Sequence, residues 1–187
     1  IIRQDDWLVI DGDAGIVIVN PSPIVLEEYR FRQRQSGLER ERLSRLRHTP
    51  AVTLDGEHVE LLANIELPAD ASAALEAGAG GVGLFRSEFL FMNRGGQLPG
   101  EEEQFEAYRA AVEAMKGLPV TIRTVDIGAD KPMDRMSASE LRHEHALNPA
   151  LGLRAIRWSL SEPGMFRQQL RAILRASAFG KVKVLIP

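Results

Sequence analysis

The sequence predicts an α/β fold in which parallel strands alternate with helices, preceded by a β-hairpin and a long linker helix. Three observations predict it. Residues 59–187 alternate short apolar runs with amphipathic stretches of helical period. Residues 24–47 contain one glycine and no proline and are rich in Glu, Arg, Gln and Leu, as in an exposed helix. Residues 7–21 place two apolar runs on either side of an Asp/Gly-rich turn.

The first expected element is the β-hairpin. Trp7–Ile10 and Ile16–Asn20 are apolar runs of strand length, and Asp11–Gly15 between them has the composition of a tight turn. Pro21 and Pro23 close the second run.

The helix expected at residues 24–47 differs in composition from the later part of the chain, so we interpret it as a connector between two domains. Its arginines allow two interpretations: contact with a nucleic acid or an acidic partner, or a solvated helix with Glu–Arg pairs on its surface. We favour the solvated helix because acidic residues interrupt the positive run. These are Glu27, Glu28, Glu39 and Glu41.

From residue 59 onward we expect three strand–helix units and a last strand. The second helix is the clearest, since apolar residues from Phe105 to Met115 recur at intervals of three and four. Asp70 is expected to be the N-cap of the first helix. The expected strands are Val59–Ile65, Val82–Phe85, Val120–Thr124 and Val182–Ile186, and the expected helices are Pro68–Gly78, Glu101–Met115 and Met165–Ala176. The sequence between the third strand and Pro149 is polar and rich in turn residues.

Two architectures fit this order of elements. One is an open, doubly wound sheet. The other is a (β/α)8 barrel of about 250 residues, of which residues 59–187 form the first half. The dinucleotide fingerprint G-x-G-x-x-G does not follow a strand, because the glycines at 78–81 precede one. This disfavours a nucleotide-binding open sheet.

Composition excludes several classes of site. The 187 residues have a formal net charge of −3 and contain no cysteine, so disulfides, thiolate metal sites and cysteine nucleophiles are excluded within this chain. No run of roughly 20 apolar residues is present to span a membrane. The near-neutral charge argues against a nucleic-acid binder. We expect a cytoplasmic protein. Of its 23 basic residues, 19 are arginines, which suit the binding of carboxylate or phosphate.

Two arginines stand at strand ends, where α/β folds bind ligands. Arg86 follows the second strand expected after residue 59, and Arg123 lies near the end of the third. Neighbouring parallel strands are about 4.8 Å apart, so both guanidinium groups can converge on one anion bearing phosphate, carboxylate or both. The alternative is an internal salt bridge, for instance Arg86 with Glu88 or Arg123 with Asp126.

Three other features are candidates for chemistry. Asp126 and Asp130 could bind a divalent cation, although an Asp/Gly turn is the favoured interpretation. The triplet 143–145, His-Glu-His, superficially resembles a metal cluster but lies in an expected loop. The glycine-rich stretch 78–83 could cradle phosphate, whereas a helix C-cap and close backbone packing are the favoured interpretation.

Five collinear blocks carry a resemblance to a known family. The first reads Gly-Val-Gly-Leu-Phe-Arg-Ser-Glu-Phe-Leu-Phe-Met and contains Arg86. The third reads Ile-Arg-Thr-Val-Asp-Ile-Gly-Ala-Asp-Lys and contains Arg123. The blocks are residues 81–92, 101–108, 122–131, 148–157 and 169–177. Together they resemble enzyme I of the bacterial phosphotransferase system, the phosphoenolpyruvate–protein phosphotransferases.

The resemblance implies a (β/α)8 barrel that binds phosphoenolpyruvate with Mg²⁺. Residues 1–22 correspond to the C-terminal tail of a swivelling phosphohistidine domain, 23–50 to the linker helix and 51–187 to the N-terminal half of the barrel. Arg86 and Arg123 match the family's substrate-binding arginines. The phosphorylated histidine and the catalytic cysteine have no counterpart here, and the Mg²⁺ ligands are expected beyond residue 187. No catalytic or metal-binding residue is therefore expected in this internal fragment, nor activity from it alone.

The resemblance also implies partners. The phosphoryl group passes to an enzyme histidine and then to a histidine-containing phosphocarrier protein, in the service of sugar uptake. The carrier binds a domain absent from this chain, and the parent enzyme is a homodimer. The parent is either a free enzyme I or a multiphosphoryl transfer fusion protein.

Two alternatives remain. Pyruvate phosphate dikinases and phosphoenolpyruvate synthases share the Gly-Leu-x-Arg-x-Glu element but are less similar after the third strand. A non-catalytic interaction module is the second alternative. The enzyme interpretation requires Arg86 and Arg123 to be uncompensated and to face one cavity, whereas the module interpretation predicts that each pairs with an acidic neighbour such as Glu88 or Asp126.

Overall fold

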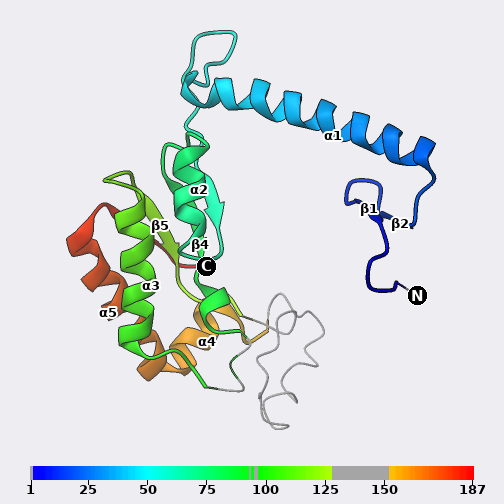
Figure 1. Ribbon diagram of the computed structural model, residues 1–187. Helices are drawn as coiled ribbons and strands as arrows, with labels where there is room; N and C mark the ends of the chain where they lie inside the picture. Colours follow the sequence, from blue (N-terminus) through cyan, green and yellow to red (C-terminus); the bar gives the residue numbers. More distant parts are fainter. Residues whose placement is uncertain (1, 93, 95–96, 128–151) are drawn as a thin grey trace. The chain divides into compact units, whose positions relative to one another are not determined.

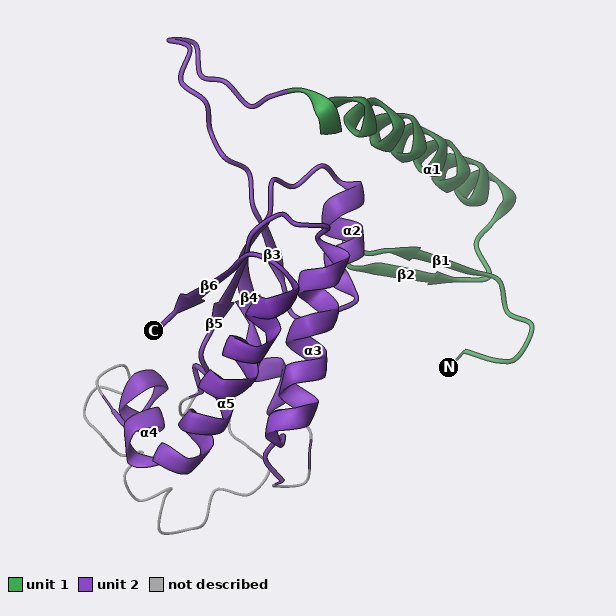
Figure 2. Ribbon diagram, turned by 90° about the vertical axis from the view of Figure 1, so that its left-hand side faces the viewer, with its two compact units in different colours: residues 1–49 green, residues 50–187 purple. Residues whose placement is uncertain are grey.

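The computed structural model describes residues 2–92, 94, 97–127 and 152–187. The chain divides into two compact units, Ile1–Thr49 and Pro50–Pro187. Figure 2 shows them in green and purple. The first unit is a hairpin followed by a helix, and the second is a parallel sheet covered by helices (Figures 1 and 2).

The first unit begins with the predicted hairpin. Strands β1 (Leu8–Asp11) and β2 (Ile16–Val19) pair antiparallel. In the turn between them, the Asp11 carboxylate accepts a hydrogen bond from the Ala14 N–H at 2.9 Å. Gly15 has φ +66°, a left-handed conformation that glycine adopts without steric cost. The tight turn predicted from the Asp/Gly composition is therefore confirmed.

Helix α1 (Pro23–Ser44), continued by the turn η1 (Arg45–His48), confirms the solvated helix expected at residues 24–47. The Ser22 side chain caps it by accepting the Val25 N–H, and none of its residues is buried. Although α1 has 22 residues, no helix in the described part of the chain is long and apolar enough to cross a membrane. Four Glu–Arg pairs run along it: Glu27–Arg30, Glu28–Arg32, Glu39–Arg42 and Glu41–Arg45.

The second unit is built on a four-stranded sheet in which all strands are parallel and each lies beside its neighbour in sequence (Figure 2). The strands predicted second, third and fourth are confirmed. The first was predicted too long, because only its last three residues join the sheet. The strands are β3 (Ala63–Ile65), β4 (Val82–Arg86), β5 (Val120–Arg123) and β6 (Val182–Leu185).

Helices cover one face of this sheet. Apolar side chains of α2, α3 and α5 form a single core with residues of all four strands, and the Phe85 ring lies edge-on to the Tyr108 ring with centroids 5.8 Å apart. The three predicted helices are confirmed in position. The helical elements are α2 (Asp70–Glu76), η2 (Ser87–Leu90), α3 (Glu101–Ala114), α4 (Ala155–Ser161), α5 (Pro163–Ala176) and η5 (Ser177–Phe179).

The prediction that Asp70 caps α2 is wrong. The N-cap residue is Ala69, and Asp70 is the first helical residue. Its carboxylate instead accepts the backbone N–H groups of Glu66 at 3.1 Å and Leu67 at 2.9 Å. Asp70 therefore stabilises the loop between β3 and α2. Like an N-cap residue it accepts free backbone N–H groups, but these groups lie in the loop before the helix and not in its first turn.

Helix α4 carries no sequence pattern that predicts it. Its seven residues form about two turns, too few for a helical period to be evident. Its Trp158 packs against a second small core made by Phe91, Val125, Ile127 and Met165. A contact between distant parts of the chain accounts for this helix better than its local pattern does.

The glycine-rich stretch after α2 serves packing, as favoured. Gly78 follows the helix with φ +87°, the left-handed conformation that ends many helices. A Cβ on Gly81 would lie 2.6 Å from the carbonyl oxygen of Pro119, and one on Gly83 would lie 2.8 Å from Cβ of Leu62. The chain thus needs glycine here for a turn and for the close approach of neighbouring segments.

Candidate functional site

The two arginines predicted to bind an anion lie side by side. Arg86 is the last residue of β4, Arg123 is the last residue of β5, and their Cα atoms are partners in the parallel register. The preceding residues, Phe85 and Ile122, are fully buried in the core under the helices. Because successive side chains of a strand point to opposite faces, both arginines are directed to the other face of the sheet.

Arg86 pairs with a carboxylate that follows the neighbouring strand. Its Nη1 is 2.7 Å from Oε1 of Glu66, which comes directly after β3. The two side chains are 35% and 44% exposed. An ion pair this accessible to water is weak, so its arginine can exchange the carboxylate for another anion at low cost.

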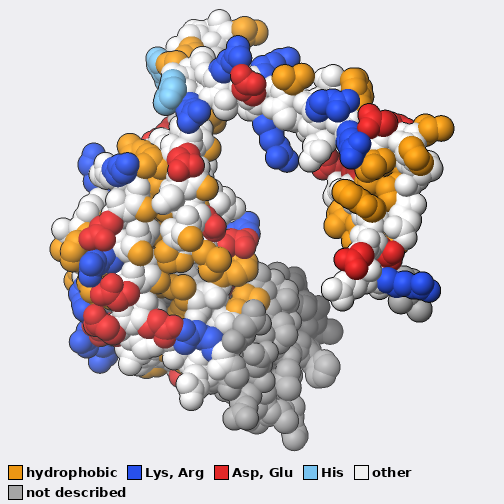
Figure 3. Space-filling model, in the orientation of Figure 1, with side chains coloured by type: hydrophobic (Ala, Val, Ile, Leu, Met, Phe, Trp, Pro, Cys, Tyr) orange, Lys and Arg blue, Asp and Glu red, His pale blue; other side chains and the backbone are white. Residues whose placement is uncertain are grey.

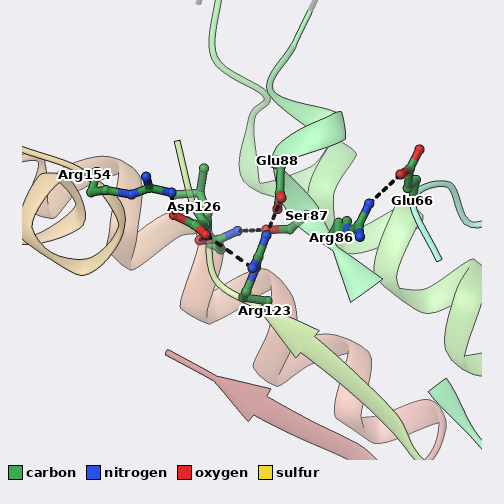
Figure 4. Close-up of polar contacts among 9 residues, drawn as sticks. Glu66, Arg86, Ser87, Glu88, Arg123, Asp126 and Arg154 are labelled. Carbon is green, nitrogen blue, oxygen red and sulfur yellow. Dashed lines mark hydrogen bonds and ion pairs between the residues drawn. The ribbon is translucent and has the colours of Figure 1, made fainter. Parts of the chain in front are cut away.

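Arg123 is held more tightly. Its Nη2 donates to the carboxylate of Glu88 in η2, and its Nη1 lies 3.2 Å from Oδ2 of Asp126 (Figure 4). The Arg123 side chain is 17% exposed, and that of Glu88 is fully buried. A buried carboxylate needs a cation or several hydrogen bonds, so Glu88 and Arg123 fix one another in place.

A third guanidinium group, not predicted from the sequence, joins this cluster. Arg154 precedes α4, and its Nη2 lies 3.0 Å from Oδ1 of Asp126. Asp126 thus bridges Arg123 and Arg154 (Figure 4). The available signal was the block 148–157, which carries the family resemblance but gave no residue a role.

One expectation attached to the enzyme interpretation is wrong. Arg86 and Arg123 are each paired with carboxylates, as the module interpretation predicts. The partners are also only partly those named from the sequence, since Arg86 pairs with Glu66 and not with Glu88. Pairing by itself does not argue against anion binding, because fixed ion pairs hold guanidinium groups in position until a stronger anion arrives.

The described residues offer no metal site. Among them, no group of three or more His, Asp and Glu residues is placed to hold a metal ion. Asp126 contacts two arginines, whose positive charge opposes a cation at the same carboxylate. Asp130 and the His-Glu-His triplet at 143–145 lie outside the described residues.

Comparison with known proteins gives the class to which this fold and site belong. Residues 40–187 match the family described as PEP-utilising enzyme, PEP-binding domain. The match covers most of the chain. The chain therefore belongs to this family of phosphoenolpyruvate-utilising enzymes.

Curated relatives carry a more specific name, phosphoenolpyruvate-protein phosphotransferase, which agrees with the resemblance of the five blocks. The relative from Cupriavidus necator is 72% identical over 187 residues, all of this chain and 31% of the relative. The relatives from Staphylococcus carnosus and Staphylococcus aureus are 48% and 45% identical over 186 residues, with 31% and 32% of their length covered. The chain thus spans about a third of the length of these relatives.

Proposed function

We propose that this chain is a segment of a phosphoenolpyruvate–protein phosphotransferase and forms part of its phosphoenolpyruvate site. The observation that carries the proposal is that Arg86 and Arg123 lie opposite one another in the register, at the carboxyl ends of two neighbouring parallel strands. Phosphoenolpyruvate bears a phosphate and a carboxylate, and both are anions that guanidinium groups bind in a bidentate manner. The name shared by the relatives supports the phosphotransferase over a dikinase or a synthase.

The arginines act by position and charge. Phosphoryl transfer spreads negative charge over the phosphate oxygens, and fixed guanidinium groups stabilise that charge without reorganising at the moment of reaction. Glu88 keeps Arg123 in place from the buried side. Asp126, which bridges Arg123 and Arg154, is the carboxylate that the incoming anion displaces.

The strand order supports a barrel. Each of the four strands lies beside the next one in sequence, without the switch point at which an open doubly wound sheet reverses its order. Helices on one face and arginines at the carboxyl ends agree with part of a (β/α)8 barrel. Residues 51–187 are assigned to its N-terminal half, 23–50 to the linker helix and 1–22 to the tail of a swivelling phosphohistidine domain.

The other groups that the reaction needs belong, in this proposal, to parts of the enzyme other than these 187 residues. The histidine that accepts the phosphoryl group and the domain that binds the phosphocarrier protein belong to other parts of a homodimeric, cytoplasmic enzyme that serves sugar uptake. Magnesium, which the family resemblance implies, has no ligand set among the described residues, and its ligands are expected beyond residue 187.

The test is a chimera in which these 187 residues replace the matching segment of the Cupriavidus necator phosphotransferase. The assay is the exchange of labelled pyruvate into phosphoenolpyruvate. The chimera is expected to be active, and Arg86→Ala or Arg123→Ala is expected to lower kcat/KM by roughly 100-fold or more. Arg45→Ala, which removes an exposed arginine paired with Glu41 on the linker, is the matched control and is expected to keep the activity of the chimera.

The outcomes separate the alternatives. If the chimera is active and both arginine variants retain its kcat/KM, these strand ends do not bind the substrate and the proposal is wrong. If Arg123→Ala fails to fold, the kcat/KM of Arg86→Ala alone decides. This variant is expected to fold, because Arg86 and its partner Glu66 are both partly exposed.

A further inference from the structure

A buried amide joins the two arginine-bearing segments from behind. Gln169 in α5 is fully buried. Its Oε1 accepts the backbone N–H of Val125 at 3.0 Å, and its Nε2 donates to Oγ of Ser87 at 3.0 Å. Ser87 directly follows Arg86, and Val125 is the second residue after Arg123. One side chain therefore contacts both segments just past the last register pair of β4 and β5.

The orientation of this amide is fixed by its surroundings. A backbone N–H can only donate, so the oxygen of the amide must face Val125 and its NH2 group must face Ser87 and the Tyr108 hydroxyl, the latter at 3.0 Å. The hydroxyl donates onward to Oε1 of Gln104 at 3.2 Å, and Nε2 of Gln104 donates to the Pro99 carbonyl at 2.9 Å. Each bond thus sets the direction of the next.

Core packing does not account for an amide at this position. Ala172, Ile173 and Ala176 on the same helix belong to the apolar core, where a buried polar group is costly unless its hydrogen bonds are made. At Gln169 they are made, and two of them go to the segments that carry the candidate anion ligands. The Arg123–Glu88 ion pair ties the same two segments through their charged side chains. The strand ends are thus joined by two independent links.

We propose that Gln169 is a positioning residue for the phosphoenolpyruvate site. Through Ser87 and Val125 it sets the spacing and orientation of Arg86 and Arg123, without itself touching the substrate. The inference rests on the proposed function of these arginines. Its physical basis is that displacements of about 1 Å in groups that orient a substrate lower rates by up to roughly 100-fold.

The test uses the chimera and the labelled-pyruvate exchange. Gln169→Met keeps an unbranched side chain of similar size but removes the hydrogen bonds to Ser87 and Val125, and it is expected to raise the KM for phosphoenolpyruvate by about tenfold or more. Tyr108→Phe is the matched control, because it removes a hydroxyl from the same buried chain while leaving both of those bonds in place. Both variants are expected to melt at a lower temperature, but only Gln169→Met is expected to change KM.

The proposal is overturned if Gln169→Met has the KM and kcat of Tyr108→Phe. If Gln169→Met does not fold, Ser87→Ala, which removes the bond from Gln169 beside Arg86 and keeps the bond to Val125, must raise KM several-fold on the same reasoning. An unchanged KM in that variant overturns the proposal as well. Loss of activity in the two arginine variants together with an unchanged Gln169→Met rejects only the positioning role, whereas active arginine variants reject the proposed function itself.

Discussion

Ion pairs between arginine and glutamate occur in both compact units, and their settings differ. On α1 and the turn after it, Glu41 and Arg45 are four residues apart, with side chains 63% and 75% exposed. At the ends of β4 and β5, Glu88 and Arg123 are 35 residues apart, with side chains that are 0% and 17% exposed. Figure 3 shows acidic and basic side chains intermingled over the surface drawn, so residue type alone does not distinguish the two settings.

The difference shows what turns an ion pair into part of a site. A pair between residues three or four apart on a helix can be foreseen from the sequence, but water screens it and its contribution is small. A pair that joins distant segments around a buried carboxylate fixes a guanidinium group at one place. Pairing between segments distant in sequence, with burial in addition at Arg123, therefore marks the candidate site, and the presence of arginine alone does not.

The largest expected effect comes from removing the negative charge at each pair. Glu88→Gln is expected to destabilise the second unit by about 3 kcal/mol, because it leaves Arg123 without its buried carboxylate. Glu41→Gln is expected to change stability by less than about 0.5 kcal/mol. The measurement for Glu88→Gln is urea unfolding followed by fluorescence of Trp158, in a Trp7→Phe background so that the signal reports the second unit. For Glu41→Gln, which lies on α1 in the first unit, the same unfolding is followed by helical circular dichroism. Equal effects of the two substitutions would remove the distinction between the two kinds of pair.

The elements that could be predicted from sequence are those with a local signal. The hairpin turn and α1 carry such signals, and α3 and α5 have apolar residues at helical intervals. The first strand was predicted too long because residues such as Val59 and Leu61 are apolar but remain exposed, at 48% and 62%. For α4, a short segment stabilised by distant contacts, local pattern was insufficient.

The site divides in the same way. Arg86 and Arg123 could be found because strand ends bind ligands in α/β folds, and the register confirms that they are neighbours. Asp126 was named correctly as a partner of Arg123, because it lies only three residues further along the chain. The other contacts could not be named, because Glu66 reaches Arg86 across a strand pair and Arg154 reaches Asp126 over 28 residues. Such partners depend on how segments distant in sequence come together, which the spacing of residues does not encode.

The buried chain behind the arginines gives a second way to sharpen the contrast with α1. Burial raises the pKa of the Tyr108 phenol from its ordinary value of 10 to about 12. The unfolded chain therefore loses this proton first as the pH rises. The protonated phenol contributes to the free energy of unfolding fully below pH 10, and this contribution is lost as the pH rises from about 10 to 12. The total loss of stability is about 2–3 kcal/mol.

The measurement is the free energy of unfolding as the pH rises from about 9 to about 12, for the wild-type chain and for Tyr108→Phe. The variant is expected to be less stable at pH 9 but to lose less stability as the pH rises, since it has no phenol to ionise in the unfolded state. Parallel curves for the two proteins would show that this hydroxyl is not shielded from water.

Two glycines test the contrast between the packed second unit and the solvated α1 with the smallest expected effects on stability. Gly81, ahead of β4, has no room for a Cβ beside Pro119, whereas Gly37 within α1 has nothing within 4 Å of that position. Gly81→Ala is expected to destabilise the second unit by about 1–3 kcal/mol, by overpacking. Gly37→Ala is expected to stabilise α1 by about 0.5–1 kcal/mol, because alanine loses less backbone entropy in a helix. Trp158 fluorescence reports the first variant and helical circular dichroism the second. The two substitutions are expected to change stability in opposite directions because the second unit is closely packed at Gly81, whereas α1 is solvated at Gly37. A destabilising Gly37→Ala would mean that α1 is packed against another surface.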